Sequence, residues 1–322
     1  VIVGLFLPDS VHLERSTTIA APQSTVFALV NSFKRTNEWS PWAKIDPATV
    51  YDYEGPQQGV GAKMSWQSDH RDVGSGSQEI TGSDPHQRVE THLDFGPQGT
   101  AEAFFDLAAA EGGTKVTWGF DSDFGYNLIN RYFGTMIDSM VGASYEEGLA
   151  SLKELAESLP PADFADLDAE TTQVEAIPIA YLSGTSSQDS AAIAEAFGNA
   201  YGQIGAFMGA HGLAPAGQPI AINAAWEDES YAFDAAIPIT ALPEGEVPAD
   251  SAVQIGQTYA GKVLKAVHVG PYSDLESTYE KITAYLTAYG IETADRSWDE
   301  WVSDPGQTPE EELVTHIYFP IE

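Results

Sequence analysis

The sequence predicts an α+β protein of two domains, and three observations support that prediction. Short strand-like segments between residues 11 and 159 are closed by one long amphipathic helix. A polar, proline-led stretch at residues 160–172 is typical of a linker. A strand–helix–hairpin pattern then occurs twice between residues 173 and 322, which predicts a duplicated βαββ domain.

The first domain is expected to be a curved antiparallel sheet that meets a long C-terminal helix. Residues 13–19 alternate as a strand, and Pro22 opens a helix that leads to the motif Trp39-Ser40-Pro41-Trp42. Turn residues then separate six strand-like segments, at residues 50–54, 62–68, 76–83, 88–95, 100–108 and 114–121.

The closing helix is predicted at about residues 128–159, from apolar residues at three- and four-residue spacing. Gly134, Gly142 and Gly148 lie within it. Each costs about 1 kcal/mol relative to alanine, so we expect close packing or ligand space to explain them.

The segments 14–22 and 26–30, and especially Trp39–Trp42, resemble the START-like (polyketide cyclase/dehydrase-like) helix-grip family. The resemblance covers nearly half of the chain. It implies a sheet that grips the long helix and leaves an apolar cavity for lipids or other hydrophobic molecules. Candidate lining residues, each with plain core packing as the alternative, are Trp66, Phe104, Trp118, Met136 and Met140.

The second domain is predicted to contain two copies of one unit. The first copy has a strand at residues 179–184, a helix at about 189–211 and a hairpin that ends near Ile239. The second repeats this order from Ala266 to Ile321. Twinned units normally pack together, and the groove between them is a natural small-molecule site.

Three motifs make this second domain resemble the GyrI-like effector-binding family: residues 268–272, residues 303–305 and residues 317–320. The resemblance implies binding of bulky aromatic, often cationic compounds in a central groove, and hydrolysis of ring-strained toxins by some free-standing members. The family carries a buried glutamate in its last strand, where this chain has His316. Because imidazole attracts cations poorly, this departure argues against cation binding and against hydrolysis.

Strand alternation puts His316 and Tyr318 on one face of the last strand, and alignment of the two copies makes Asp234 the counterpart of His316. We therefore expect Asp234 and His316 to line opposite walls of one groove; the alternative is that both face solvent. The aromatic surface of that groove is expected to come from Trp226, Tyr272, Trp298, Trp301 and Tyr318.

His268 lies inside the best motif, but a single histidine between two valines is more often structural. The seven histidines show no metal-ligand spacing. No phosphate-binding loop and no nucleophile elbow is recognisable. The sequence therefore predicts neither a metal nor a cofactor.

Composition limits the partners and the compartment. The 322 residues include 48 Asp and Glu against 14 Lys and Arg, a formal net charge of −34 at pH 7. Such a surface repels phosphate, so we expect no nucleic-acid partner. The carboxylates are scattered along the chain, which favours a solvated acidic surface over a dedicated cation site. Cysteine is absent, which excludes thiol chemistry but assigns no compartment.

Residues 1–10 begin with an apolar stretch far shorter than the roughly 20 residues that cross a bilayer. It is interpreted either as the remnant of a signal or anchor segment or as a short buried or frayed segment. The first interpretation leads us to expect a periplasmic protein, or one anchored in the membrane upstream of this chain and facing the periplasm. A cytoplasmic protein is the alternative. The sequence does not specify the oligomeric state.

Three functions stay open. The leading one is non-enzymatic binding of hydrophobic or aromatic small molecules by a sensor, carrier or sequestering protein. The second is a hydrolase or detoxifying enzyme with Asp234 or His316 as base and Tyr272 or Tyr318 as proton donor. The third is an envelope or regulatory module that binds another polypeptide, which predicts a large exposed apolar patch.

Overall fold

The computed structural model of the protein describes residues 7–227, 229–242 and 251–322. The first six residues of the apolar segment at 1–10 lie outside this description. The chain divides into two compact units. The N-terminal unit comprises the described residues up to Asp166 together with Thr283–Gly290, and the C-terminal unit comprises Leu167–Ile282 and Ile291–Glu322. Both are α+β with antiparallel sheets, as the sequence predicts.

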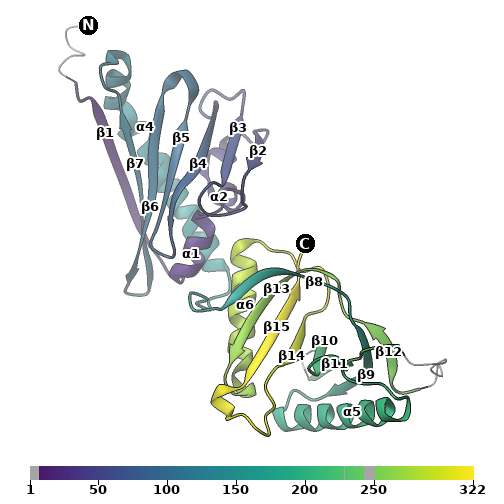
Figure 1. Cartoon of the computed structure of the whole chain (residues 1–322). Helices are drawn as coiled ribbons and strands as arrows, with labels where there is room; N and C mark the ends of the chain where they lie inside the picture. The colour runs from purple at the N-terminus through teal and green to yellow at the C-terminus, as the bar shows by residue number, and fades with distance from the viewer. Residues whose placement is uncertain (1–6, 228, 243–250) are drawn as a thin grey trace. The chain divides into compact units, whose positions relative to one another are not determined.

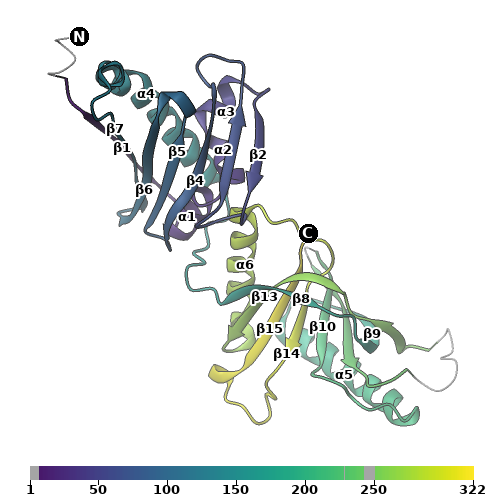
Figure 2. The ribbon, with the colours of Figure 1, turned by 45° about the horizontal axis from the view of Figure 1, so that its top comes forward.

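The N-terminal unit is built on a seven-stranded sheet of order β1-β7-β6-β5-β4-β3-β2, with α4 running along it (Figures 1 and 2). Its strands are β1 (Ser10–Ile19), β2 (Val50–Glu54), β3 (Lys63–Gln67), β4 (Ser75–Asp84), β5 (Arg88–Asp94), β6 (Thr100–Ala110) and β7 (Gly113–Asp123). Its helices are α1 (Gln23–Val30), α2 (Phe33–Trp39), α3 (Pro41–Ile45), η2 (Gly96–Gln98) and α4 (Leu128–Ser158).

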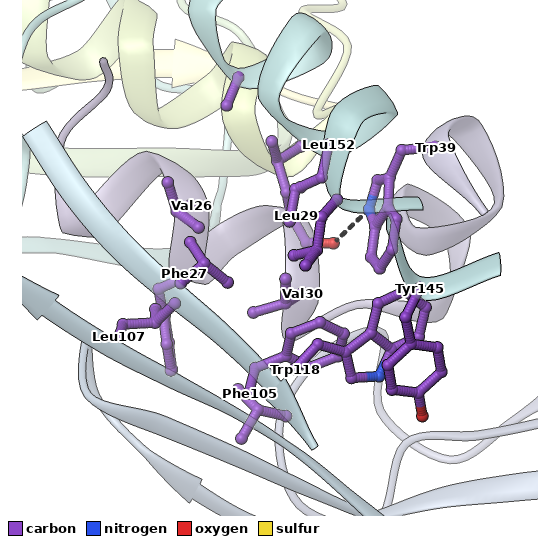
Figure 3. Packing of buried hydrophobic residues seen from close by; sticks show 14 of the residues in the cluster. Val26, Phe27, Leu29, Val30, Trp39, Phe105, Leu107, Trp118, Tyr145 and Leu152 are labelled. Atoms are coloured by element: carbon purple, nitrogen blue, oxygen red, sulfur yellow. Dashed lines mark hydrogen bonds between the residues drawn. The ribbon is translucent and has the colours of Figure 1, made fainter. Parts of the chain in front are cut away.

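Large aromatic rings fill the core between this sheet and its helices (Figure 3). Trp118 of β7 stacks on Tyr145 of α4 with ring centroids 3.8 Å apart, and on Phe105 of β6 at 5.0 Å. Trp39 is fully buried, and its Nε1 donates a hydrogen bond to the Leu29 carbonyl at 3.2 Å. The first tryptophan of the Trp39–Trp42 motif is therefore a core residue with its one polar group satisfied.

The structure explains why α4 begins where it does and why it contains glycine. The Asn127 side chain accepts hydrogen bonds from the backbone N–H groups of Ile129 and Asn130, which caps the first turn. A Cβ atom at Gly148 would lie 2.7 Å from the ring of Trp118. Glycine thus lets the helix approach the sheet closely, so packing explains this position.

The C-terminal unit is an eight-stranded sheet of order β12-β9-β11-β10-β14-β15-β13-β8. Its strands are β8 (Ala169–Val174), β9 (Pro178–Ser186), β10 (Ile220–Glu227), β11 (Ser230–Pro238), β12 (Gln254–Gln257), β13 (Gly261–Val269), β14 (Trp298–Trp301) and β15 (Val314–Pro320). Its helical segments are α5 (Ser190–Ala210), η3 (Tyr272–Asp274), η4 (Glu310–Glu312) and the first part of α6 (Leu275–Tyr289), whose residues from Thr283 onward belong to the N-terminal unit. The predicted duplication is present, because β9-α5-β10-β11 and β13-α6-β14-β15 repeat one topology.

Three strand pairings join the copies. At the centre, β10 of the first copy pairs antiparallel with β14 of the second. At the edges the copies exchange strands: β8 precedes the first copy in sequence but pairs with β13, and β12 precedes the second copy but pairs with β9. The sheet is therefore continuous across both copies.

The sheet has a face covered by α5 and α6, called here the helix face, and an opposite face. Phe197 of α5 stacks on Phe233 of β11 at 4.1 Å, and Tyr279 of α6 contacts Phe319 of β15 at 5.9 Å. Ile317, two residues before Phe319, is fully buried. The predicted alternation along the last strand is thus confirmed, with Ile317 and Phe319 facing the helices.

Helix ends also follow the sequence signals. The Asp189 side chain caps α5 by accepting hydrogen bonds from the backbone N–H groups of Ala191 and Ala192, both at 3.0 Å. Gly290, directly after α6, has a φ of 63°. That left-handed conformation favours glycine, as expected at a helix C-terminus.

Candidate ligand site on the helix face

Five aromatic rings form a continuous row on the helix face, called here the aromatic row. In order they are Tyr272 of η3, Trp301 of β14, Phe197 of α5, Tyr231 of β11 and Trp226 of β10. Successive centroids are 5.0, 6.3, 6.3 and 5.0 Å apart. The two ends are accessible, since Trp226 is 64% exposed and Tyr272 is 37% exposed. Apolar rings exposed beside a rigid aromatic core are a typical surface for binding flat organic molecules.

Hydrogen bonds fix the middle of the aromatic row. The indole Nε1 of Trp301 donates to the Tyr201 hydroxyl at 3.0 Å, and that hydroxyl donates to the Ile220 carbonyl at 2.9 Å. Burial raises the pKa of Tyr201, which keeps its proton in place for this bond. The row is therefore held by both copies, through α5, β10 and β14.

A buried carboxyl group adjoins the aromatic row. Asp299 precedes Trp301 by two residues on β14 and is 5% exposed. Its Oδ1 accepts a hydrogen bond from the Tyr279 hydroxyl at 2.5 Å. The Asn223 side chain donates to that hydroxyl at 3.0 Å and accepts from the Tyr231 hydroxyl at 2.6 Å. This network connects the carboxyl to a ring of the row.

Burial makes Asp299 a weak acid. Desolvation raises the pKa of Asp299 to about 7, although hydrogen bonds from Tyr279 and Asn223 lower it in part. The carboxyl therefore changes charge near neutral pH, at a place where its ionised form has no cationic partner among the described side chains.

Sequence analysis selected three members of the aromatic row, Trp226, Tyr272 and Trp301, and missed Asp299. A signal for it was present in the segment Trp298-Asp299-Glu300-Trp301. Alternation along a strand places residues 299 and 301 on one face. If Trp301 packs against the helices, the carboxyl group of Asp299 must therefore be buried beside it.

The other predicted groove residues lie on the opposite face. Asp234, Trp298 and Tyr318 share it, because Asp234 and Trp298 both pair across Ile222 of β10 and Trp298 pairs with Tyr318. The rings of Trp298 and Tyr318 stack at 4.8 Å. The expectation of one groove containing all seven predicted residues is therefore wrong, because alternation on β14 separates Trp298 from Trp301.

Charged partners surround Asp234 and His316 on that face. Asp234 accepts hydrogen bonds from the Ser183 hydroxyl at 2.5 Å and from Arg296 Nη1 at 2.7 Å. His316 Nδ1 lies 3.0 Å from Oε2 of Glu300, a residue that sequence analysis did not select. Asp234 is thus neutralised by an arginine, while His316 has a carboxylate beside it.

Tyr318 completes this second cluster. Its hydroxyl donates to the same Oε2 of Glu300 at 3.0 Å. Burial, with the nearby Glu300 carboxylate, raises the pKa of Tyr318, so the phenol stays protonated.

His268, by contrast, is structural: its Nδ1 lies 2.8 Å from the Thr278 hydroxyl and its Nε2 lies 3.2 Å from the Pro271 carbonyl.

The N-terminal unit does not bring its five predicted lining residues together. Trp118 and Trp66 pack with the core. Phe104 alternates with the core residue Phe105 and lies under the Arg88 guanidinium at 4.3 Å, on the outer face of the sheet. Met136 and Met140 of α4 are 42% and 61% exposed. The expectation that Phe104 and the two methionines line an interior cavity is therefore wrong.

Two properties can be stated of the part of the chain that the structure describes. Within it, no three or more His, Asp or Glu side chains are grouped so as to hold a metal ion. None of its helices combines the length and the apolar character needed to traverse a bilayer.

Comparison with family models assigns both units. Residues 10–157 match the family described as polyketide cyclase / dehydrase and lipid transport. Residues 169–322 match the GyrI-like small molecule binding domain. The chain joins one domain of each family. Both assignments agree with the resemblances in the sequence, and small-molecule binding is the property that the GyrI-like family description carries.

The chain is also similar to solved structures, at low sequence identity and low TM-score. The EcmrR C-terminal domain has a TM-score of 0.43 and 13% identity, over 48% of this chain and 98% of that one. A hydrolase encoded by lin2189 from Listeria innocua has a TM-score of 0.35 and 13% identity, over 48% and 92%. Ara h 8.0201 has a TM-score of 0.35 and 14% identity, over 45% and 99%. No curated protein sequence matches the chain.

Proposed function

We propose that the chain binds an aromatic small molecule at the aromatic row of its GyrI-like domain and acts without catalysis, as a sensor, carrier or sequestering protein. The observation that supports this is the row itself, with exposed rings at both ends and a buried carboxyl alongside. A rigid set of rings needs little reorganisation to accept the aromatic rings of a ligand.

The exposed rings supply most of the affinity. Covering the accessible part of Trp226 would contribute on the order of 3 kcal/mol from apolar burial. Stacking on Tyr272 would add about 1 kcal/mol. Together these values amount to about 4 kcal/mol, which corresponds to a dissociation constant of about 1 mM before the cost of association is included.

Asp299 sets the preferred charge of the ligand. An ionised carboxylate in this buried position gains from a nearby cation, and the protonated form gains nothing. Because the pKa of Asp299 is raised to about 7, a cation that lowers it releases a proton on binding near neutral pH. The favoured ligand class is therefore an aromatic cation.

Tetraphenylphosphonium and tetraphenylborate have the same shape and opposite charge, so they test both parts of the proposal. We expect titration calorimetry at pH 8 and 0.5 M salt to show tighter binding of the cation, with a preference that shrinks in Asp299→Asn. The double variant Trp226→Ala/Tyr272→Ala should bind the cation at least tenfold more weakly. Tyr53→Ala, which removes an exposed ring of the N-terminal domain, is the control. Unchanged affinity in the double variant would remove the aromatic row from the site.

One observation favours a second candidate, a hydrolase on the opposite face. The Glu300 carboxylate forms a hydrogen bond with His316 Nδ1, and Nε2 of the same ring has no hydrogen-bond partner among the described residues. Such a ring acts as a general base: it accepts a proton from water as the water oxygen bonds to an electrophilic carbon. The ring then acts as a general acid and gives that proton to the oxygen whose bond to the carbon breaks. The Asp234 carboxylate is already occupied by hydrogen bonds from Arg296 and Ser183.

Turnover of p-nitrophenyl acetate or styrene oxide tests this candidate. His316→Ala and Glu300→Gln should each reduce the rate at least a hundredfold, and Ser183→Ala, on the same face but beside Asp234, should not. Rates equal to buffer for the wild-type chain, or equal rates in all three variants, would eliminate the hydrolase.

A further inference from the structure

The first half of α4 in the N-terminal domain carries a stripe of large apolar side chains on its solvent side. The stripe consists of Ile129, Tyr132, Met136 and Met140, which are 70%, 63%, 42% and 61% exposed. Their spacing of three, four and four residues places them on one face of the helix over three turns, a length of about 16 Å. Exposed apolar residues normally occur singly, so an aligned set marks an interaction surface.

The stripe lies opposite the face by which α4 packs on its own domain. Ile137, Val141 and Tyr145 follow the same helical period half a turn away, and they pack with the core. The stripe therefore contributes nothing to the domain core. It stops where Glu146 and Glu147 begin the second, charged half of the helix.

Arg131 and Asp138, the charged residues in this half of α4, lie away from the stripe and have partners within the domain. Arg131 is buried and donates to the carbonyls of Gly125 and Leu7. Asp138 and Glu146 both pair with Arg15, at 2.8 and 2.9 Å. The stripe is thus an uncharged ridge on a chain whose net charge is −34.

We propose that this ridge docks on a phospholipid surface without net charge. A helix that presents Ile, Met and Tyr on one face inserts that face at the boundary between headgroups and acyl chains, and tyrosine favours this depth. Tyr126, which is 93% exposed, adds a second tyrosine at the start of the helix. The acidic surroundings disfavour an anionic membrane, since they repel its headgroups.

Charge also argues for lipid over a second copy of the chain. Two ridges in contact would bring together, from both copies, the carboxylate of Glu147, which follows Met140 by two turns on the same side of α4, and that of Glu146 beside it. A neutral bilayer carries no such repulsion. Arg131 donates a hydrogen bond to the Leu7 carbonyl at 3.2 Å, so the polypeptide enters β1 at this same end of α4.

Flotation with phosphatidylcholine vesicles tests the proposal. The full chain of 322 residues should float with the vesicles, and its partition coefficient should fall at least tenfold in Met136→Ser/Met140→Ser. A matched control is Val50→Ser/Val60→Ser, which changes two exposed apolar residues of the same domain outside the ridge and should float like the wild type. All three proteins retain residues 1–7, so a difference between their partition coefficients is due to the ridge and not to these residues.

Thermal unfolding should be the same for the three proteins, because the substituted side chains are exposed. Vesicles with a third of their lipid as phosphatidylglycerol should bind the wild type more weakly at low salt. The proposal is overturned if the wild type stays with the unbound fraction. It is also overturned if the methionine variant floats equally well, or if sedimentation shows a dimer that the methionine substitutions dissociate.

Discussion

Asp299→Asn gives the sharpest test of the buried network on the helix face. The substitution keeps the size of the side chain and an oxygen that can accept from the Tyr279 hydroxyl, but it removes the titratable proton. Any fixed cost of the amide is the same at every pH. The pH dependence of stability is therefore the informative quantity.

The expected magnitude follows from the raised pKa. The folded chain binds the Asp299 proton with a pKa of about 7, whereas the ordinary pKa of an aspartate, as in the unfolded chain, is 3.8. The stabilisation is therefore complete below pH 3.8 and is lost as the pH rises through 7, in total about 4 kcal/mol. About 2.6 kcal/mol of that loss falls between pH 5 and pH 8.

Urea unfolding of both proteins at pH 5, 6, 7 and 8 measures this difference. The remaining acidic residues are shared by the two proteins, so their titration cancels in the comparison. The variant should gain about 2.6 kcal/mol of unfolding free energy relative to the wild type between pH 5 and pH 8. A constant difference over this range would show that Asp299 titrates as an ordinary exposed carboxyl, and the account of the network would be wrong.

Three smaller predictions concern helices. Gly148→Ala should destabilise the N-terminal domain by about 1–3 kcal/mol in urea unfolding, because its Cβ would lie 2.7 Å from Trp118 and 3.1 Å from Pro41; an unchanged midpoint would contradict this. Gly202→Ala in α5 is its counterpart, since no atom lies within 4 Å of the new Cβ, and it should stabilise the GyrI-like domain by up to about 1 kcal/mol. Asp189→Ala should cost about 1 kcal/mol by removing the α5 cap, whereas equal helicity and stability would show that the cap is dispensable.

The order of strands and helices was predictable because each signal is local. Alternation at residues 13–19, the capping side chain of Asp189 and the glycine after α6 all act within a few residues. The family motifs added the pairing of the two copies. These signals decide which elements form and which face of the last strand meets the helices.

The sites were harder to predict. They depend on which face of a short strand each side chain occupies and on which side of a helix packs against the sheet. β14 has only four residues, so two tryptophans three residues apart point to opposite faces, and the sequence alone does not say which one meets the helices. Met136 and Met140 have core-like spacing in α4 but occupy its outer face. Asp299 and Glu300 were missed because their importance comes from cross-strand neighbours, Tyr279 and His316, that are remote in sequence.

The exchange of β8 and β12 makes the two halves of the GyrI-like domain mutually dependent. A fragment that ends before β12 would contain β8 without its acceptor β13, and β9 without the strand that covers its outer edge. Two such fragments could each donate a strand to the other, which is the arrangement of an intertwined homodimer. One polypeptide thus connects two halves that, as separate chains, would complete their sheets only by association.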